Sequence, residues 1–171
     1  MNVENNSKSM CVLTPVNFVI CGELTIDAPV EAVWPRALEY TSWQHFTHVE
    51  SISGKASEEG EVVLLRKVEK GLEEFPPYYA KTLKLVNKKQ IVWKTFPKEG
   101  EDFSDFTGII DFRFRPVNGN TKFSYSIYYE FRIQENDDKK VQEYERDMKA
   151  NFEALIADTM PRLKHLVESE G

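Results

Sequence analysis

The sequence has few of the residues that build metal sites or disulfide frameworks. Only two cysteines, Cys11 and Cys21, occur in the 171 residues, and no CxxC motif is present. The three histidines, His45, His48 and His165, form no metal-ligand spacing with them. We therefore expect no metal and no cofactor. We interpret the cysteines as reduced thiols of a cytoplasmic protein, with pairing in an oxidising compartment as the alternative.

Long apolar runs are also missing. A transmembrane helix needs about 20 predominantly apolar residues, and the apolar stretch at residues 10–21 is interrupted by Pro15 and Asn17. The residues before this stretch carry no net positive charge, and no small-residue cleavage site follows it. These features predict a cytoplasmic protein without a secretory signal or a membrane span.

Positively charged residues are fewer than negatively charged ones. The formal net charge is −6, from 22 Lys and Arg against 28 Asp and Glu. Nucleic-acid binding requires a basic face that neutralises phosphates. The two adjacent lysine pairs, Lys88-Lys89 and Lys139-Lys140, fall at a predicted turn and at a predicted helix start. We therefore expect no nucleic-acid partner.

Aromatic residues, in contrast, are abundant, with 11 Phe, 7 Tyr and 3 Trp. They gather in segments where apolar and polar residues alternate, which is typical of half-buried strands. The alternation predicts strands over residues 16–26, 47–54, 61–69, 78–86, 90–96, 105–116 and 121–133. Short connections such as Asn118-Gly119 make neighbouring strands antiparallel. The length suits one domain, placed at 15–171 after a flexible segment 1–14.

Helical signals lie on both sides of the six later strands. Asp27 and Pro29 are typical of a helix start, and they predict two short helices that end near Phe46. Apolar residues recur at spacings of three and four over 139–167, which predicts one long amphipathic helix. Pro161 lies inside this helix and is expected to kink or split it, because proline removes a backbone hydrogen bond.

This order of elements resembles the SRPBCC superfamily of START-like and birch-pollen-allergen-like proteins. The stretch IDAPVEAVW at residues 26–34 is similar to the I-x-A-P-x-E-x-V-W start of the first helix in the polyketide cyclase/dehydrase-like branch. Trp43 followed by VESI at 49–52 is similar to the usual step into the second strand. The resemblance implies an α+β helix-grip fold: a seven-stranded curved antiparallel sheet wraps around a long C-terminal helix, with two short helices between strands 1 and 2. It also implies an apolar ligand cavity, which a kink at Pro161 is expected to open.

Candidate ligand-binding residues are those predicted to face this cavity. They are Arg66, Trp93, Tyr125, Tyr129, Met148, Phe152 and Ile156. Arg66 falls on the less charged face of its strand, where a guanidinium needs an anionic partner. The phenols of Tyr125 and Tyr129 need hydrogen-bond partners when buried. Ordinary core packing is the alternative for the apolar candidates, and an internal acid or the cavity mouth is the alternative for Arg66.

Three functions remain open at this point. The first is binding of a small hydrophobic or aromatic ligand, such as a lipid or a polyketide-like molecule. The second is a polyketide cyclase/dehydratase-type enzyme in which a tyrosine, His45 or Arg66 supplies an acid or base; surface positions are the alternative for His45 and His48. The third is a protein-interaction module of the chaperone-activator type. A patch or homodimer contact is then predicted from apolar residues on otherwise polar strand faces, Val63, Leu65, Val92 and Ile109. The resemblance assigns no catalytic residue and does not choose among these functions.

Overall fold

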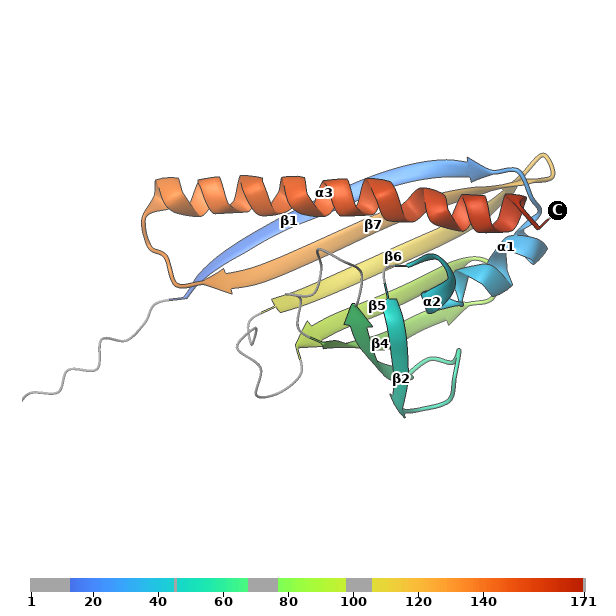
Figure 1. The fold of residues 1–171 in the computed structure, drawn as a ribbon, viewed down its shortest axis with the longest axis horizontal. Helices are drawn as coiled ribbons and strands as arrows, with labels where there is room; N and C mark the ends of the chain where they lie inside the picture. The colour runs from blue at the N-terminus through green and yellow to red at the C-terminus, as the bar shows by residue number, and fades with distance from the viewer. Residues whose placement is uncertain (1–12, 45, 68–76, 98–105, 171) are drawn as a thin grey trace, which may run out of the picture.

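The computed structural model shows the predicted order of elements (Figure 1). It describes residues 13–44, 46–67, 77–97 and 106–170. Along the chain lie β1 (Thr14–Ile26), α1 (Val30–Ala37), α2 (Tyr40–Trp43), β2 (Phe46–Ser53), β3 (Val62–Lys67), β4 (Tyr78–Val86), β5 (Gln90–Pro97), β6 (Phe106–Val117), β7 (Asn120–Ile133) and α3 (Asp138–Glu168). The predicted flexible segment 1–14 falls outside the described residues up to residue 12, and Thr14 already belongs to β1. His45 also lies outside the described residues.

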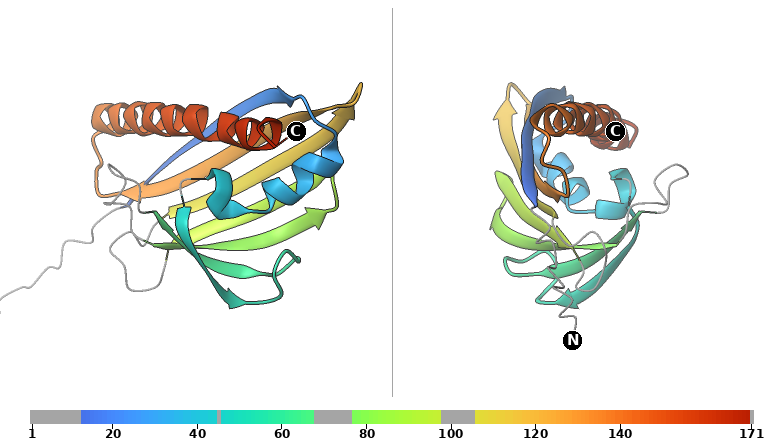
Figure 2. Two further views of the ribbon diagram at one scale, coloured as in Figure 1. Left: turned by 45° about the vertical axis from the view of Figure 1, so that its right-hand side comes forward. Right: turned by 90° about the vertical axis from the view of Figure 1, so that its left-hand side faces the viewer.

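The strands form one antiparallel sheet. Its order is β1-β7-β6-β5-β4-β3-β2, with seven strands. The first and last strands along the chain are neighbours, because β1 pairs with β7 over its whole length, with Val19 opposite Tyr128. The two views in Figure 2 show the sheet curving around the helices. The architecture is therefore the predicted α+β helix-grip fold, with α1 and α2 between β1 and β2.

Alternation of side chains decides which face of the sheet is buried. The inner face, which faces α3, carries a buried aromatic and aliphatic layer: Phe18, Ile20, Ile91, Trp93, Phe106, Phe112, Phe123, Ile127, Tyr129 and Phe131. The outer face is the opposite side of the same strands. Asn118 and Gly119, which join β6 to β7, have φ angles of 51° and 84°. These positive angles at both central residues match the predicted type I′ hairpin turn.

The helix α3 begins where its capping residue predicts. The side chain of Asp137 accepts a hydrogen bond from the backbone N–H of Lys140 at 3.0 Å. The helix packs against β1, α1 and α2. It runs through Pro161 without interruption, so the predicted split does not occur. No helix in the described residues has both the length and the apolar character needed to cross a membrane.

The prediction that Arg66 points into the space between sheet and helix is wrong. Leu65 pairs with Tyr78 and Val63 pairs with Ala80, and all four lie together on the inner side of the sheet. Arg66 alternates with Leu65 and is exposed on the outer face. Because valines and leucines occupy both faces of β3, the positions of its charged residues did not show which face is the inner one.

The predicted outer patch changes for the same reason. Val63 and Leu65 are each 3% exposed on the inner side, so they cannot contribute to an interaction surface. Val92 and Ile109 are half-buried on the outer face. A homodimer contact through these two residues stays a prediction.

Candidate ligand-binding site

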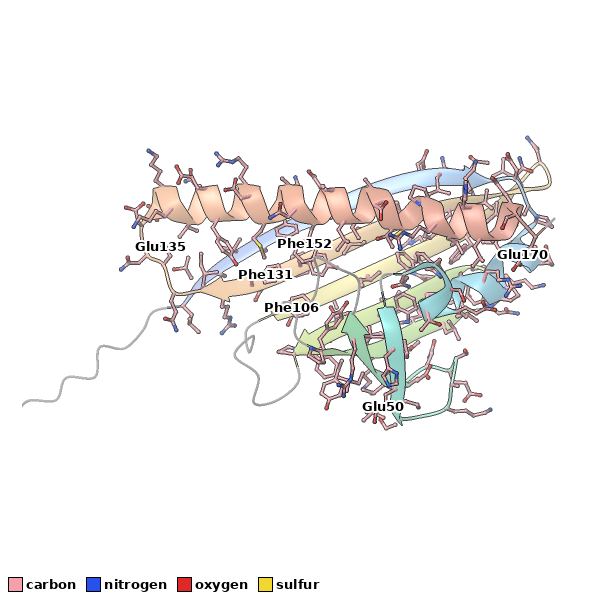
Figure 3. The ribbon with its side chains drawn as sticks, viewed as in Figure 1. Glu50, Phe106, Phe131, Glu135, Phe152 and Glu170 are labelled. Atoms are coloured by element: carbon pink, nitrogen blue, oxygen red, sulfur yellow. The ribbon has the colours of Figure 1, made fainter. Side chains whose placement is uncertain are left out.

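The inner face beneath α3 brings two predicted site residues into direct contact. The rings of Tyr129 in β7 and Phe152 in α3 have centroids 4.5 Å apart. The ring of Phe106 in β6 stacks on the ring of Tyr129, with centroids 5.8 Å apart. Figure 3 labels Phe152 on α3 and Phe131 and Phe106 on the sheet; the ring of Phe131 lies between the other two, with centroids 5.8 Å from Phe152 and 5.3 Å from Phe106. Helix and sheet therefore meet through aromatic rings at this end of the inner face.

A second aromatic group lies around Phe112. Trp93 of β5 meets Phe112 edge-to-face at 5.3 Å, and Trp43 of α2 meets the same ring at 5.8 Å. Trp93 is buried on the inner face, and its contact with a ligand stays a prediction. Trp43 is not among the predicted site residues, because its place over the sheet depends on how α2 folds back.

Gly108 of β6 separates two polar side chains of the inner face. It pairs with Thr95 of β5 on one side and with Tyr129 of β7 on the other. A Cβ atom at Gly108 would lie 2.3 Å from Thr95 Oγ1 and 2.9 Å from Tyr129 Cε1. The absence of a side chain therefore lets Tyr129 and Thr95 approach across the middle strand. A glycine at an inner-face position of an alternating strand was the signal that the sequence offered.

Among the described residues, several polar atoms in or beside this layer are buried without a hydrogen-bond partner. They are Thr95 Oγ1, Trp43 Nε1 and the neighbouring Gln44 Nε2. An unsatisfied buried polar group costs about 1–3 kcal/mol, and such groups in proteins are usually satisfied by water or by a ligand. These atoms mark places where a bound molecule would gain hydrogen bonds.

Burial keeps the inner phenols protonated. It raises the pKa of Tyr129 well above its ordinary value of 10.0. It also raises the pKa of Tyr78, to which the nearby Tyr129 contributes. At neutral pH both hydroxyls can donate a proton in a hydrogen bond, and neither serves as a base.

Charged side chains are absent from the inner-face positions of β5, β6 and β7 within the described ranges. A buried carboxylate, Glu61, immediately precedes β3 and so lies outside these three strands. Its Oε2 accepts a hydrogen bond from the backbone N–H of Ser57 at 2.8 Å. In the described parts of β5, β6 and β7, the inner-face side chains are therefore polar only through hydroxyl and indole groups.

The remaining predicted residues lie around this centre. Ile156 is buried one turn after Phe152 on α3, and Met148 packs half-buried one turn before it. Tyr125 is half-buried and lies over Gly22, where a Cβ atom would be 2.2 Å from its hydroxyl oxygen. His48 is exposed and pairs in register with Arg66, away from the inner face.

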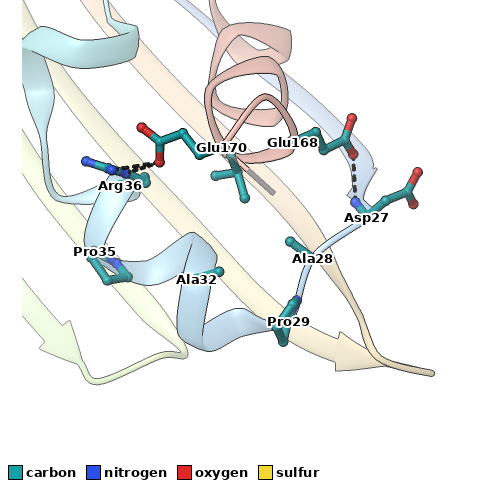
Figure 4. A pocket seen from close by; sticks show the side chains of 9 residues that line it. Asp27, Ala28, Pro29, Ala32, Pro35, Arg36, Glu168 and Glu170 are labelled. Atoms are coloured by element: carbon teal, nitrogen blue, oxygen red, sulfur yellow. Dashed lines mark hydrogen bonds and ion pairs between the residues drawn. The ribbon is translucent and has the colours of Figure 1, made fainter.

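Surface pockets accompany the helices. One of about 870 Å³ lies between α1 and the end of α3 (Figure 4). Arg36 and Glu170 form an ion pair of 2.6 Å across it, and the backbone N–H of Asp27 donates to Glu168 at 2.7 Å. Another of about 430 Å³ is lined by Pro161 and residues of α2 and α3. A path from this pocket into the interior stays a prediction.

Comparisons with known proteins identify the fold. No protein-family model and no curated protein sequence matches the chain. Solved structures match over almost its entire length. An uncharacterised protein from Rhizobium leguminosarum has a TM-score of 0.61 at 13% identity, covering 92% of this chain and 99% of that one. Ara h 8.0201 has a TM-score of 0.60 at 11% identity, covering 90% and 99%.

A third similar structure is norcoclaurine synthase from Thalictrum flavum, in complex with dopamine and hydroxybenzaldehyde. It has a TM-score of 0.60 at 18% identity, covering 92% of this chain and 90% of that one. These neighbours are birch-pollen-allergen-like proteins of the SRPBCC helix-grip superfamily. The fold inferred from the order of elements and from IDAPVEAVW is confirmed. At these identities the likeness extends to the fold and not to an activity.

Proposed function

We propose that this protein binds a small, uncharged, aromatic or otherwise hydrophobic molecule between the inner face of its sheet and α3. The observation that carries the proposal is the set of buried polar atoms without a partner within an aromatic layer, above all Thr95 Oγ1 and Trp43 Nε1. Such groups are unfavourable in a fully packed apolar core, because each of them costs free energy when it is left without a hydrogen bond.

The chemistry of the inner face suggests what the ligand looks like. The aromatic rings around Phe112 and Tyr129 favour a flat apolar body, which would gain from its burial and from ring contacts. The indole of Trp43 can only donate a hydrogen bond, whereas the hydroxyl of Thr95 can donate and accept. The ligand is therefore expected to carry at least one carbonyl, ether or hydroxyl oxygen.

The charge balance argues for an uncharged ligand. No charged side chain lies on the described inner-face positions of β5, β6 and β7. An ionised ligand there would lose its hydration without gaining a counter-ion, which costs several kcal/mol. The norcoclaurine synthase complex, which holds dopamine and hydroxybenzaldehyde, supports the aromatic character of the ligand. The absence of charge on the ligand rests on this chain's inner face alone, because the amine of dopamine is protonated at neutral pH.

Three naphthalenes with different head groups test the proposal. The probes are 2-acetylnaphthalene, with an acceptor oxygen, 2-ethylnaphthalene, with none, and 2-naphthoate, which is ionised. Trp34, Trp43 and Trp93 are all buried, so quenching of their fluorescence reports binding. We expect the acetyl compound to bind most tightly and the naphthoate least tightly.

The matched variants are Thr95→Val on the inner face and Thr107→Val on the outer face of β6. Thr95→Val keeps the shape of the side chain and removes the hydroxyl. It is expected to weaken the binding of 2-acetylnaphthalene about 5–10-fold, which corresponds to one net hydrogen bond, and to leave 2-ethylnaphthalene unchanged. Thr107→Val should change neither. Absence of saturable quenching by all three compounds would refute the proposed function.

A further inference from the structure

The outer face of the sheet carries a pocket that the proposed function does not use. It has a volume of about 500 Å³ and lies on the opposite side of the strands from the inner aromatic layer. We call it the basic pocket, after the polar residues that line it: Glu23, Lys89, Arg113, Arg115, Lys122 and Ser124. Four of these six side chains carry positive charge in a protein whose net charge is −6.

Strand pairing brings these side chains together. Arg113 and Arg115 of β6 lie directly opposite Ser124 and Lys122 of β7, respectively. Lys89 belongs to the turn between β4 and β5, and its carbonyl accepts a hydrogen bond from the backbone N–H of Phe114 at 2.9 Å. The turn is therefore held against β6, and Lys89 adds a fourth positive side chain to Arg113, Arg115 and Lys122.

Internal ion pairs neutralise only part of this charge. Lys122 pairs with Glu23 at 2.7 Å, and Arg113 pairs with Asp111 at 2.8 Å. Within the described residues, neither Arg115 nor Lys89 has an acidic partner. An excess of two positive charges thus remains around the pocket.

The pairing of β6 with β7 places two positively charged residues at directly opposed positions. Arg115 and Lys122 are directly opposed across the β6–β7 ladder, and like charges at opposed positions destabilise a sheet. An anion seated beside Arg115 would be attracted by its guanidinium and by Lys89, and also by Lys122, whose charge Glu23 neutralises only in part. Arginine offers a planar fork of N–H donors and lysine an ammonium group, which together are well suited to phosphate oxygens.

We propose that the basic pocket is a binding site for a phosphate group, with Arg115, Lys122 and Lys89 as its cationic ligands and the hydroxyl of Ser124 as a further donor. The pocket is far larger than one phosphate ion, so its volume leaves room for a phosphate ester. The ester could be a water-soluble molecule or the headgroup of a lipid, since both present the same phosphate chemistry to the outer face.

The primary experiment is a titration of ¹⁵N-labelled protein with inorganic phosphate, followed by amide chemical shifts at constant ionic strength. We expect saturable shifts at residues 113–115 and 122–124, and none when chloride replaces phosphate. Arg115→Gln should weaken phosphate binding at least tenfold. Arg132→Gln serves as the matched control, because it removes the same charge from an exposed position on the outer face of β7, away from the pocket.

The outcomes separate a site from general electrostatics. Equal weakening by Arg115→Gln and Arg132→Gln, or equal shifts with chloride, would overturn the proposal. In phosphate-free buffer Arg115→Gln should unfold at the same or a higher urea concentration than the wild type, because it relieves the repulsion with Lys122. A clear loss of stability would instead make Arg115 a structural residue and overturn its role as a ligand.

Two further probes identify the source of the phosphate. Glycerol 3-phosphate represents a soluble ester, and phosphatidylcholine vesicles with and without phosphatidic acid represent a lipid surface. Binding of either one that is abolished by Arg115→Gln supports the proposal and names the source. Failure of both, together with failure of inorganic phosphate, rejects it. The inner-face test with naphthalenes is unaffected by these results, so the two proposals fail independently.

Discussion

Gly108 is the residue whose small size decides how Tyr129 lies on the inner face. Its replacement by alanine would place a Cβ atom 2.9 Å from the ring of Tyr129 and 2.3 Å from Thr95 Oγ1. Both neighbours are buried, so neither can move freely. We expect Gly108→Ala to lower the free energy of unfolding by about 1–3 kcal/mol, measured by urea denaturation.

The control for this prediction is Gly22→Ala. Its new Cβ atom would meet the far end of the Tyr125 side chain, at 2.2 Å from the hydroxyl oxygen. Because Tyr125 is only half-buried, its ring can swing away, and a smaller loss of stability is expected. Equal losses in the two variants would contradict the idea that burial of the neighbour decides the effect.

Tyr129 is also expected to make stability depend on pH in the alkaline range. Burial raises the pKa of its hydroxyl above the ordinary value of 10.0, so the unfolded chain loses this proton first. The folded state then binds more protons than the unfolded state, and the free energy of unfolding falls as pH rises above about 10.

Replacing the phenol tests this linkage. In Tyr129→Phe the free energy of unfolding should fall less steeply than in the wild type between about pH 9 and 11. Urea denaturation at several pH values gives the two slopes, and absorbance of tyrosinate checks that ionisation accompanies unfolding. Identical slopes for the two proteins would count against a buried protonated phenol.

At the scale of single elements, α3 contains an unusual residue in its interior. Pro161 is exposed and lacks the N–H that would bond to the carbonyl of Ala157. We expect Pro161→Ala to raise the free energy of unfolding by about 1–3 kcal/mol, because alanine restores this bond and has a higher helix propensity. Chemical denaturation of the two proteins measures the difference.

The same variant tests whether the end of α3 controls access to the interior. If the proline opens the structure there, uptake of an apolar fluorescent probe should fall in Pro161→Ala. Unchanged uptake together with raised stability would show that Pro161 weakens the helix without opening a path. Unchanged or lowered stability would show that the missing bond is compensated elsewhere.

At the scale of the whole molecule, the inner layer is joined by contacts between the first and last strands along the chain, β1 and β7. The ring of Phe18 in β1 packs against the rings of Tyr129 and Phe131 in β7, with centroids 5.9 and 6.0 Å apart. It also packs against the ring of Phe152 in α3, with centroids 5.7 Å apart. These contacts join residues separated by more than a hundred positions, which is typical of slowly folding proteins. The inner layer is therefore complete only after the end of the chain has been placed.

Substitutions at two neighbouring positions of β1 test this arrangement. Phe18→Ala is expected to lower the free energy of unfolding by about 3–5 kcal/mol, since it leaves a cavity between three elements. Val19→Ala, on the outer face and 49% exposed, should cost less than about 1 kcal/mol. Denaturant unfolding of both variants is the measurement, and comparable losses would contradict the assigned faces of β1.

The sequence by itself determined the class of fold and most of the inner layer. Strand alternation placed Tyr129 and Trp93 on the buried face, and helical spacing placed Phe152 and Ile156 on the stripe of α3. These signals are local, because the period of a strand or helix together with the polarity of its residues decides which side is buried. Hairpin turns such as Asn118-Gly119 then oriented neighbouring strands.

Tertiary structure alone decided which faces and residues meet. The inner side of β3 depends on its pairing with β4, which turned Arg66 outward against the prediction. Thr95, Gly108 and Tyr129 come from three strands, and Glu23 and Lys122 of the basic pocket are far apart in the sequence. Contacts of this kind depend on which strands pair and on how the sheet curves, and the alternation within one strand specifies neither.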